Sequence, residues 1–241
     1  MLLFSLLSIA LANPPEVEQL TWNLAIGEVD IGQRTARVMV LPEEGGTRRM
    51  VEVQTEVSIG TTMANVAWAQ RLTVHATRGP AAFHAVLRDG LTPREIQARP
   101  HLEGWTVTVV EPEDVRTWDL PRSRIDLSTA DLYDPQSDVS LDRFGQARML
   151  STETGEVFTV EVERLGASDL EVAGTAVNVQ GYALHGGPGT TRLYYSDSGY
   201  LVRHETRILG KVVTATLTAA PPVSAEQAPL VDTVEIGEED L

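Results

Sequence analysis

The sequence contains no cysteine, and this absence excludes several kinds of chemistry at once. The chain has no disulfide, no thiolate nucleophile, no cysteine-ligated zinc and no cysteine that could carry a lipid behind a leader peptide. Extracellular domains often depend on disulfides, so an exported chain without cysteine is more typical of a soluble protein of the bacterial periplasm.

Positive charge is also scarce. The chain has 19 lysine and arginine residues against 34 aspartate and glutamate residues, which gives a formal net charge of -15. Lys211 is the only lysine. Nucleic acids and anionic membrane surfaces are recognised by concentrated positive charge. The composition therefore argues against a nucleic-acid partner and against binding to anionic lipids through a basic patch.

Long apolar runs are almost absent, and the one at the start, from Leu2 to Ala12, is too short to cross a bilayer as a helix. We therefore expect no transmembrane span. Ala10-Leu11-Ala12 matches the small-x-small pattern of a cleavage site, although no basic residue follows Met1. Residues 1–12 are thus interpreted as the signal peptide of a periplasmic protein, with secretion as the alternative.

The rest of the chain is dominated by apolar residues at every second position, the period of a strand with one wet face. Glycine-rich and Asp-Gly turn signals separate these runs, so we expect antiparallel hairpins. Flat sheets rarely exceed about ten strands. The sequence therefore predicts one all-β domain over 13–219, an antiparallel meander curled into a barrel-like or two-layer sheet. In residues 51–59 the apolar set is Val51, Val53, Val57 and Ile59, and the polar set is Glu52, Gln54, Glu56 and Ser58.

Two segments differ from this pattern. Ser128 or Thr129 can cap a helix that Pro135 ends, so we expect one short helix near 128–134, or an irregular crossover between an N-terminal set of hairpins and a C-terminal set. Residues 220–241 are acidic and rich in proline. This tail is expected to be largely disordered, with an edge strand over 230–236 as the alternative.

The stretch His185-Gly-Gly-Pro-Gly189 resembles the oxyanion-hole loop of the proline iminopeptidase branch of the α/β-hydrolases. Such an enzyme also needs a Gly-x-Ser-x-Gly elbow, and this sequence has none. The flanking residues alternate as two antiparallel strands. We therefore interpret the loop as a hairpin turn whose glycines supply positive φ angles.

Candidate metal ligands are few. His75 and His84 are symmetric about Gly79-Pro80, so a tight hairpin would place them opposite each other, but no acidic residue stands beside either at ligand spacing. The other histidines, His101, His185 and His204, are single. A cluster of aspartates matches no calcium-binding loop and is interpreted as a solvated connector. Its members are Asp126, Asp131, Asp134, Asp138 and Asp142.

The apolar face of the sheet is the remaining candidate site. It either fills a closed core or leaves a groove for a lipid or acyl chain. We expect a non-enzymatic, periplasmic binding domain without a cofactor. The alternatives are a structural or protein-interaction module of the cell envelope and, less well supported, a hydrolase or metal-dependent enzyme. The residues expected to contribute to the ligand site are Trp22, Trp68, Trp105, Trp118, Val53 and Phe158.

The C-terminal third ends in a hairpin, Tyr194 to Arg203, with the order aromatic, Tyr, Asp, Gly, Leu-Val-Arg. This hairpin and the opening strand that runs into Ile31-Gly32 resemble uncharacterised, exported, β-rich bacterial families. The resemblance implies an antiparallel, barrel-like periplasmic domain, remotely similar to the lipoprotein-carrier half-barrels. It brings no catalytic residues with it.

Overall fold

The computed structural model describes residues 16–43, 46–60, 65–76, 82–89, 92–133, 141–187, 189–208, 210–219 and 221. The predicted signal peptide lies outside these residues, as does the acidic tail except for residue 221. The strands are β1 (Glu16–Ile26), β2 (Val29–Glu43), β3 (Gly46–Gly60), β4 (Asn65–Ala76), β5 (Ala82–Asp89), β6 (Thr92–Pro100), β7 (Gly104–Glu111), β8 (Asp114–Pro121), β9 (Leu127–Ser128), β10 (Gln146–Leu150), β11 (Val157–Val172), β12 (Thr175–Gly186), β13 (Thr191–Ser196), β14 (Leu201–Ile208) and β15 (Lys211–Leu217).

All of these strands belong to one sheet, with the order β8-β7-β6-β5-β4-β3-β2-β1-β15-β14-β13-β12-β11-β10-β9. Every pairing is antiparallel except that of β9 with β10. The predicted all-β antiparallel meander is therefore confirmed. Strand β1 pairs with β15 and so joins the N-terminal wall, β1–β8, to the C-terminal wall, β10–β15.

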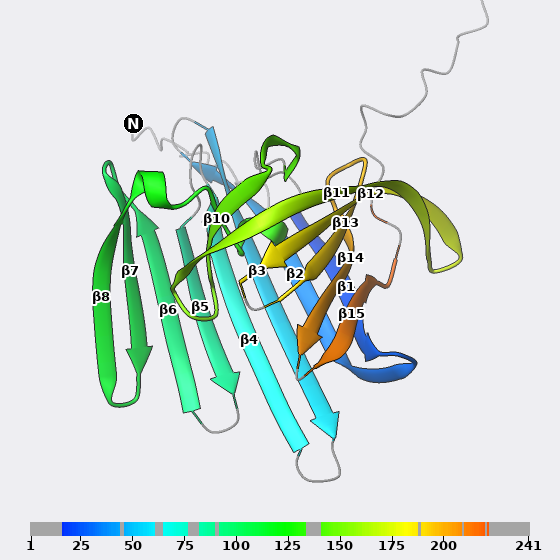
Figure 1. The fold of residues 1–241 in the computed structure, drawn as a ribbon, viewed down its shortest axis with the longest axis horizontal. Coiled ribbons are helices and arrows are strands. Elements are labelled where there is room, and N and C mark those ends of the chain that lie inside the picture. Colours follow the sequence, from blue (N-terminus) through cyan, green and yellow to red (C-terminus); the bar gives the residue numbers. More distant parts are fainter. Residues whose placement is uncertain are drawn as a thin grey trace, which may run out of the picture.

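Two hydrogen bonds show that this sheet is sharply curled. The Nε1–H of Trp22 on β1 donates to the carbonyl oxygen of Leu201 on β14 at 2.8 Å, and Arg34 on β2 lies 3.0 Å from His204 on β14. Up to two other strands separate these partners in the sheet order. Because adjacent strands are about 4.8 Å apart, such contacts need the two walls to face each other. Strands of the C-terminal wall accordingly lie in front of β1–β3 in Figure 1.

The curled sheet is not closed. Among the described residues, β8 and β9 stand at the two ends of the strand order and do not pair with each other. The inner face is apolar as expected: Val51, Val53 and Val57 on β3 are buried, whereas Gln54 and Glu56 between them are exposed. Burying a valine or leucine side chain contributes roughly 1.5–3 kcal/mol, so this face dominates the stability of the fold.

Residues 122–133 and 141–145 belong to the expected crossover between the two walls, but the expected helix is only partly present among them. Residues 127 and 128 belong to β9, and the helical part is the 3-10 turn η2 (Asp131–Tyr133), with η1 (Arg122–Arg124) and η3 (Leu141–Arg143) on either side. Asp131 accepts hydrogen bonds from the backbone N–H and the hydroxyl of Ser128. The acidic side chain thus binds the end of a strand and does not cap an α-helix.

The glycine loop at 186–189 is a hairpin turn, as predicted. It connects β12 to β13, and Gly186, Gly187 and Gly189 all have positive φ angles. A Cβ atom at Gly187 would lie 2.4 Å from the ring of Phe158. Backbone conformation and packing both require glycine here, and the resemblance to an oxyanion hole does not extend beyond the sequence.

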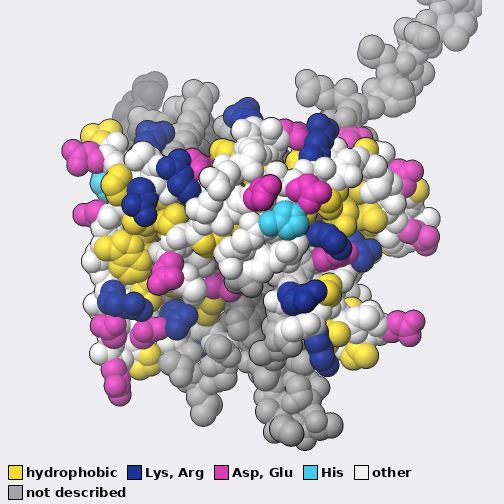
Figure 2. Space-filling model, in the orientation of Figure 1, with side chains coloured by type: hydrophobic (Ala, Val, Ile, Leu, Met, Phe, Trp, Pro, Cys, Tyr) yellow, Lys and Arg dark blue, Asp and Glu magenta, His cyan; other side chains and the backbone are white. Residues whose placement is uncertain are grey.

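Two surface properties bear on the expected partners. In the part of the chain that the structure describes, no helix is long or apolar enough to cross a membrane. On the face drawn in Figure 2, acidic and basic side chains are interspersed, and the coloured residues there form no continuous basic patch.

Candidate functional site

A short row of polar side chains crosses the apolar inner face of the N-terminal wall. Arg34 on β2 pairs in register with Thr55 on β3, and Thr55 pairs with Gln70 on β4. These three residues are only 7%, 1% and 6% exposed. Buried polar groups are costly unless they are hydrogen-bonded, so the row needs partners inside the molecule.

Arg34 is the centre of this row. Its Nε–H donates to the hydroxyl of Thr55 at 3.0 Å, and its Nη1 lies 3.0 Å from Nδ1 of His204. Its guanidinium stacks on the ring of Tyr133, 4.8 Å from the ring centroid. Arginine has no acceptor, so Nδ1 of His204 must accept this hydrogen bond and the ring proton must sit on Nε2.

No carboxylate pairs directly with Arg34. Among the described residues, no aspartate or glutamate oxygen forms an ion pair with its guanidinium. Glu153 is close enough for the charge of Arg34 to lower its pKa, but desolvation is stronger and raises that pKa overall. A buried cation without a counter-ion is unfavourable, which makes Arg34 a candidate for binding an anion.

The groups around Arg34 titrate far from their ordinary ranges. Burial, helped by the charge of Arg34, lowers the pKa of His204 to about 3, so its imidazole is neutral at physiological pH. Burial also raises the pKa of the Tyr133 hydroxyl, and Arg34 opposes that shift. The guanidinium is therefore the fixed charge of this cluster.

Solvent reaches this part of the interior. Tyr133, Tyr195 and His204 belong to the inside of the curled sheet, yet each is only half-buried. The side chain of Glu153 is exposed by surface area, although enough protein surrounds its carboxyl group to raise its pKa by desolvation. We interpret these exposures as an opening of the interior beside Arg34.

The crossover and the turn after β10 cover the inner face near this opening. Gln70 donates to the hydroxyl of Thr152 at 3.3 Å, and the hydroxyl of Tyr195 on β13 donates to the carbonyl of Leu132 at 3.1 Å. A Cβ atom at Gly155 would lie 2.8 Å from Val109 on β7. The space between the walls is thus occupied by chain segments that are not part of the main strands.

The residues predicted for the ligand site do not lie together: some are beside Arg34 and others are on β7 and β8. Trp22 is 1% exposed and pairs in register with Arg34, and Val53 lies two residues from Thr55 on the same face. Trp105 on β7 is buried, and Trp118 on β8 is half-buried beside the turn at Gly155. The two remaining candidates are Phe158, which is half-buried against Gly187, and Trp68, whose backbone lies in β4 and whose side chain is outside the described part.

His75 and His84 do not pair with each other, as a tight hairpin would have required. In the β4–β5 hairpin His75 pairs with Ala82, and His84 pairs with Thr73. The partner of His75 is therefore two residues away from His84, and the register is centred one residue before the pairing that a tight turn at Gly79-Pro80 would give. Nε2 of His84 lies 3.0 Å from a carboxylate oxygen of Glu95.

The aspartates of the predicted connector have separate roles. The carboxylate of Asp126 accepts from the Nε and Nη2 of Arg148, which lowers the pKa of Asp126. Asp142 lies 3.6 Å from Arg164, and Asp131 binds Ser128. Asp134 and Asp138 fall in a range whose structure is not described. Within the described ranges, no three histidine, aspartate or glutamate side chains are grouped as a metal site.

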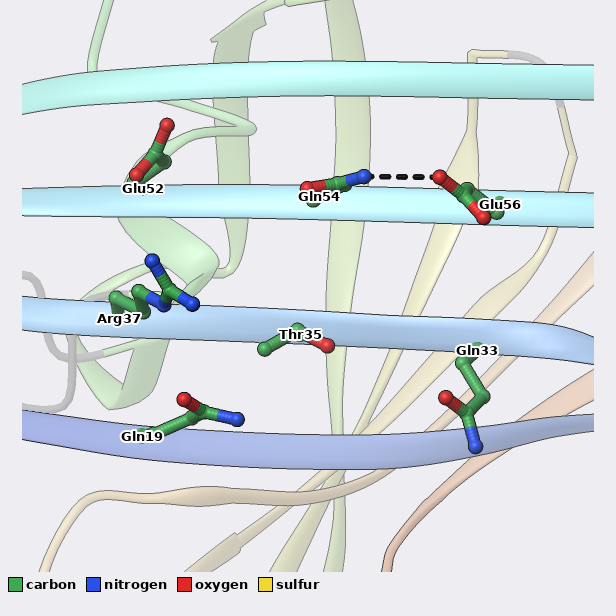
Figure 3. Close-up of a pocket in the computed structure, with 7 residues that line it drawn as sticks. All are labelled: Gln19, Gln33, Thr35, Arg37, Glu52, Gln54 and Glu56. Atoms are coloured by element: carbon green, nitrogen blue, oxygen red, sulfur yellow. Dashed lines mark hydrogen bonds between the residues drawn. The ribbon is translucent and has the colours of Figure 1, made fainter.

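A hollow lies on the opposite, solvent-facing side of β1–β3 (Figure 3). Its volume is about 390 Å³, and none of its lining residues is apolar. Within it, Gln54 donates to Glu56 at 2.8 Å. This polar surface does not suit the apolar ligand predicted from the sequence. The lining residues are Gln19, Gln33, Thr35, Arg37, Glu52, Gln54 and Glu56.

The polar row was not predicted, although the sequence contains a signal for it. Thr55 occupies an inner position of the alternation in β3, between Val53 and Val57. Arg34 likewise precedes Ala36 and Val38 at inner positions of β2. A polar residue at an apolar position of a strand is the observation that indicates such a site. His204 carries no comparable signal, because its contact with Arg34 depends on the curl.

Comparison with known proteins supports the fold and leaves the activity open. Residues 121–218, less than half of the chain, match a family described as "Domain of unknown function (DUF6134)". No curated protein matches. The chain is also similar to a crystal structure described as a beta-barrel-like protein of domain of unknown function DUF1849 from Brucella abortus. The TM-score is 0.58 at 10% identity, over 85% of this chain and 96% of that one. The expected resemblance to uncharacterised β-rich domains is confirmed.

Proposed function

We propose that this domain is a non-enzymatic binding protein of the bacterial periplasm that holds an apolar ligand, a lipid or acyl chain, between its two walls. The observation that carries the proposal is the partial solvent exposure of two side chains that contact Arg34. Inner side chains there, such as Tyr133 and His204, keep solvent contact, whereas inner residues farther along β3 and β4, such as Val51 and Leu72, have none. A chain that enters at this opening would meet an apolar face.

Such a ligand would need space that the crossover now occupies. The described part of the crossover buries Ile125, Leu127 and Leu141 in the apolar core, and the carbonyl of Leu132 accepts a hydrogen bond from Tyr195. An acyl chain that displaced part of this segment would bury apolar area at about 25 cal/mol per Å² in exchange for these contacts.

The periplasmic location rests on the sequence. The apolar start with its Ala10-Leu11-Ala12 pattern supports export. For an exported chain, the absence of cysteine fits the periplasm better than an extracellular protein stabilised by disulfides. The non-enzymatic assignment rests on the sequence, which contains neither a cysteine nor a Gly-x-Ser-x-Gly elbow.

The proposal is tested with the full chain, expressed with its own N-terminus in a bacterial host and purified without detergent. Native mass spectrometry and organic extraction are expected to show a lipid-sized adduct. The neutral probe diphenylhexatriene should bind saturably and be displaced by the extracted lipid. A mass of protein alone, together with no rise in probe fluorescence, would contradict the proposal.

A matched pair of variants shows on which face of the sheet the probe binds. Thr55→Gln adds a larger polar side chain to the inner face, and Thr35→Gln makes the same change on the outer face of the adjacent strand. Probe affinity should fall several-fold in the first variant and stay unchanged in the second. The reverse result would place the binding surface in the outer hollow.

One observation favours a protein-interaction module as the second candidate. Strand β12 pairs with β13 only from Val179 to Leu184, so the outer part of the β11–β12 hairpin is a two-stranded arm, with Val172 buried in the apolar core. It projects from the body in Figure 1. Protein co-purification that depends on this arm, with no lipid adduct, would favour the second candidate.

A further inference from the structure

We propose that Arg34, with His204 beside it, anchors the carboxylate head group of the bound ligand, which makes a fatty acid the class of ligand that this domain selects. This inference rests on the proposed function, because it concerns the head group of a chain held between the two walls. It adds the chemistry by which the site would distinguish an acid from a neutral lipid.

The first argument is the charge balance of the interior. Arg34 is 7% exposed, and within the described part of the chain its partners are a hydroxyl, an imidazole nitrogen and an aromatic ring, all of them uncharged. Removing a guanidinium from water is costly unless an anion compensates for it. A ligand carboxylate would supply the missing charge.

The second argument is the number of unused donors. A guanidinium has five N–H groups. Thr55, His204 and the hydroxyl of Tyr133 engage at most three of them. The Nε2–H of His204 also has no hydrogen-bond partner among the described residues. The remaining N–H groups can bind the two oxygens of one carboxylate in the bidentate manner that arginine favours.

The third argument is the position of the cluster. Arg34 is buried, whereas His204 and Tyr133 beside it are half-buried, and the face beyond them on β3, around Val51 and Val53, is buried and apolar. A head group at Arg34 would therefore stay near water while its alkyl chain extends over the apolar face. This is the polarity that an acyl chain with one charged end requires.

Glu153 does not take the place of this anion. It lies on the turn after β10 and forms no ion pair with Arg34 among the described residues, and its backbone carbonyl accepts from Arg94 at 3.4 Å. Desolvation raises the pKa of its carboxyl group, so the protein environment disfavours its charged form. The negative charge of a ligand carboxylate would be compensated better than that of Glu153, because the ligand would bind the guanidinium directly.

The experiment compares two probes of equal chain length, dodecanoate and 1-dodecanol, by calorimetric titration of the full-length protein. The variants are Arg34→Met, Arg34→Lys and the control Arg37→Met, which removes an exposed arginine from the outer face of the same strand. Loss of charge-assisted hydrogen bonds should weaken dodecanoate binding about 10- to 100-fold in Arg34→Met. Dodecanol affinity should change less than about twofold, since it makes no ionic contact.

Each outcome has a distinct meaning. A wild-type protein that binds dodecanol as tightly as dodecanoate would overturn the anchor while leaving the proposed function intact. Binding of neither probe would overturn the proposed function itself. Loss of dodecanoate affinity in Arg37→Met, with none in Arg34→Met, would place the anion on the outer face and overturn the anchor.

The test does not depend on one variant folding. Arg34→Lys keeps the charge and should retain part of the preference for the acid, because lysine lacks the bidentate geometry. The preference of the wild-type chain for dodecanoate over dodecanol needs no variant at all, and its absence suffices to overturn the inference.

Discussion

Replacing Trp22 with alanine is expected to lower the free energy of unfolding by about 3–5 kcal/mol. The side chain is 1% exposed, and its Nε1–H donates to the carbonyl of Leu201 at 2.8 Å. The substitution would leave a cavity and an unsatisfied backbone carbonyl where the two walls meet. Because β1 joins the walls through β15, the loss should appear as a single cooperative transition in urea, monitored by circular dichroism.

Trp118→Ala is the matched control for this prediction. Trp118 is half-buried on β8, the strand at one end of the sheet. Trp118→Ala should lower the free energy of unfolding by less than half as much as Trp22→Ala, because its side chain buries less surface in the core. Equal losses in the two variants, or a first transition that unfolds only one wall in Trp22→Ala, would contradict the packing described for Trp22.

Acidification is expected to destabilise the fold through His204. Its pKa is lowered from 6.5 to about 3, chiefly by burial and also by the charge of Arg34. Between these two values the unfolded chain binds a proton that the folded chain does not, so stability falls as the pH falls from 6.5 toward 3. In this range the titration of His204 lowers the free energy of unfolding by about 1 kcal/mol for each pH unit of acidification.

The difference between wild type and His204→Gln isolates this effect from the other titrating groups. Glutamine offers an acceptor to Arg34 and does not titrate, so urea unfolding of the variant should depend less steeply on pH below 6.5. His185→Gln, at a histidine beside Glu163 and away from Arg34, is the control for the substitution itself. Parallel curves for wild type and His204→Gln would show that His204 is not held neutral by the fold.

Much of the architecture could be predicted because strand periodicity and turn chemistry are local properties. The alternation around Val51 and Val53 identified a sheet with one wet face, and the glycine loop at 186–189 was correctly interpreted as a turn. The crossover between two sets of hairpins also followed from the break in alternation after residue 120. These features depend on neighbours in the sequence, which a single chain displays.

The features that the sequence did not predict depend on contacts between residues far apart in the chain. The partners of His75 and His84 in the β4–β5 hairpin could not be predicted, because a register is set by pairing along both strands. Ser128 and Asp131 suggested a helix cap, but pairing of β9 with β10 gives that segment a different partner. The Arg34–His204 contact joins positions 170 residues apart and exists only because the sheet curls.

The central claim, that the interior beside Arg34 binds the charged end of an acyl chain, is tested most directly by a crystal structure of the full chain with dodecanoate brominated at its last carbon. The account predicts a carboxylate within hydrogen-bond distance of the Arg34 guanidinium and an anomalous bromine signal between the two walls. A carboxylate bound to Arg37 on the outer face, or a bromine signal outside the walls, would contradict it.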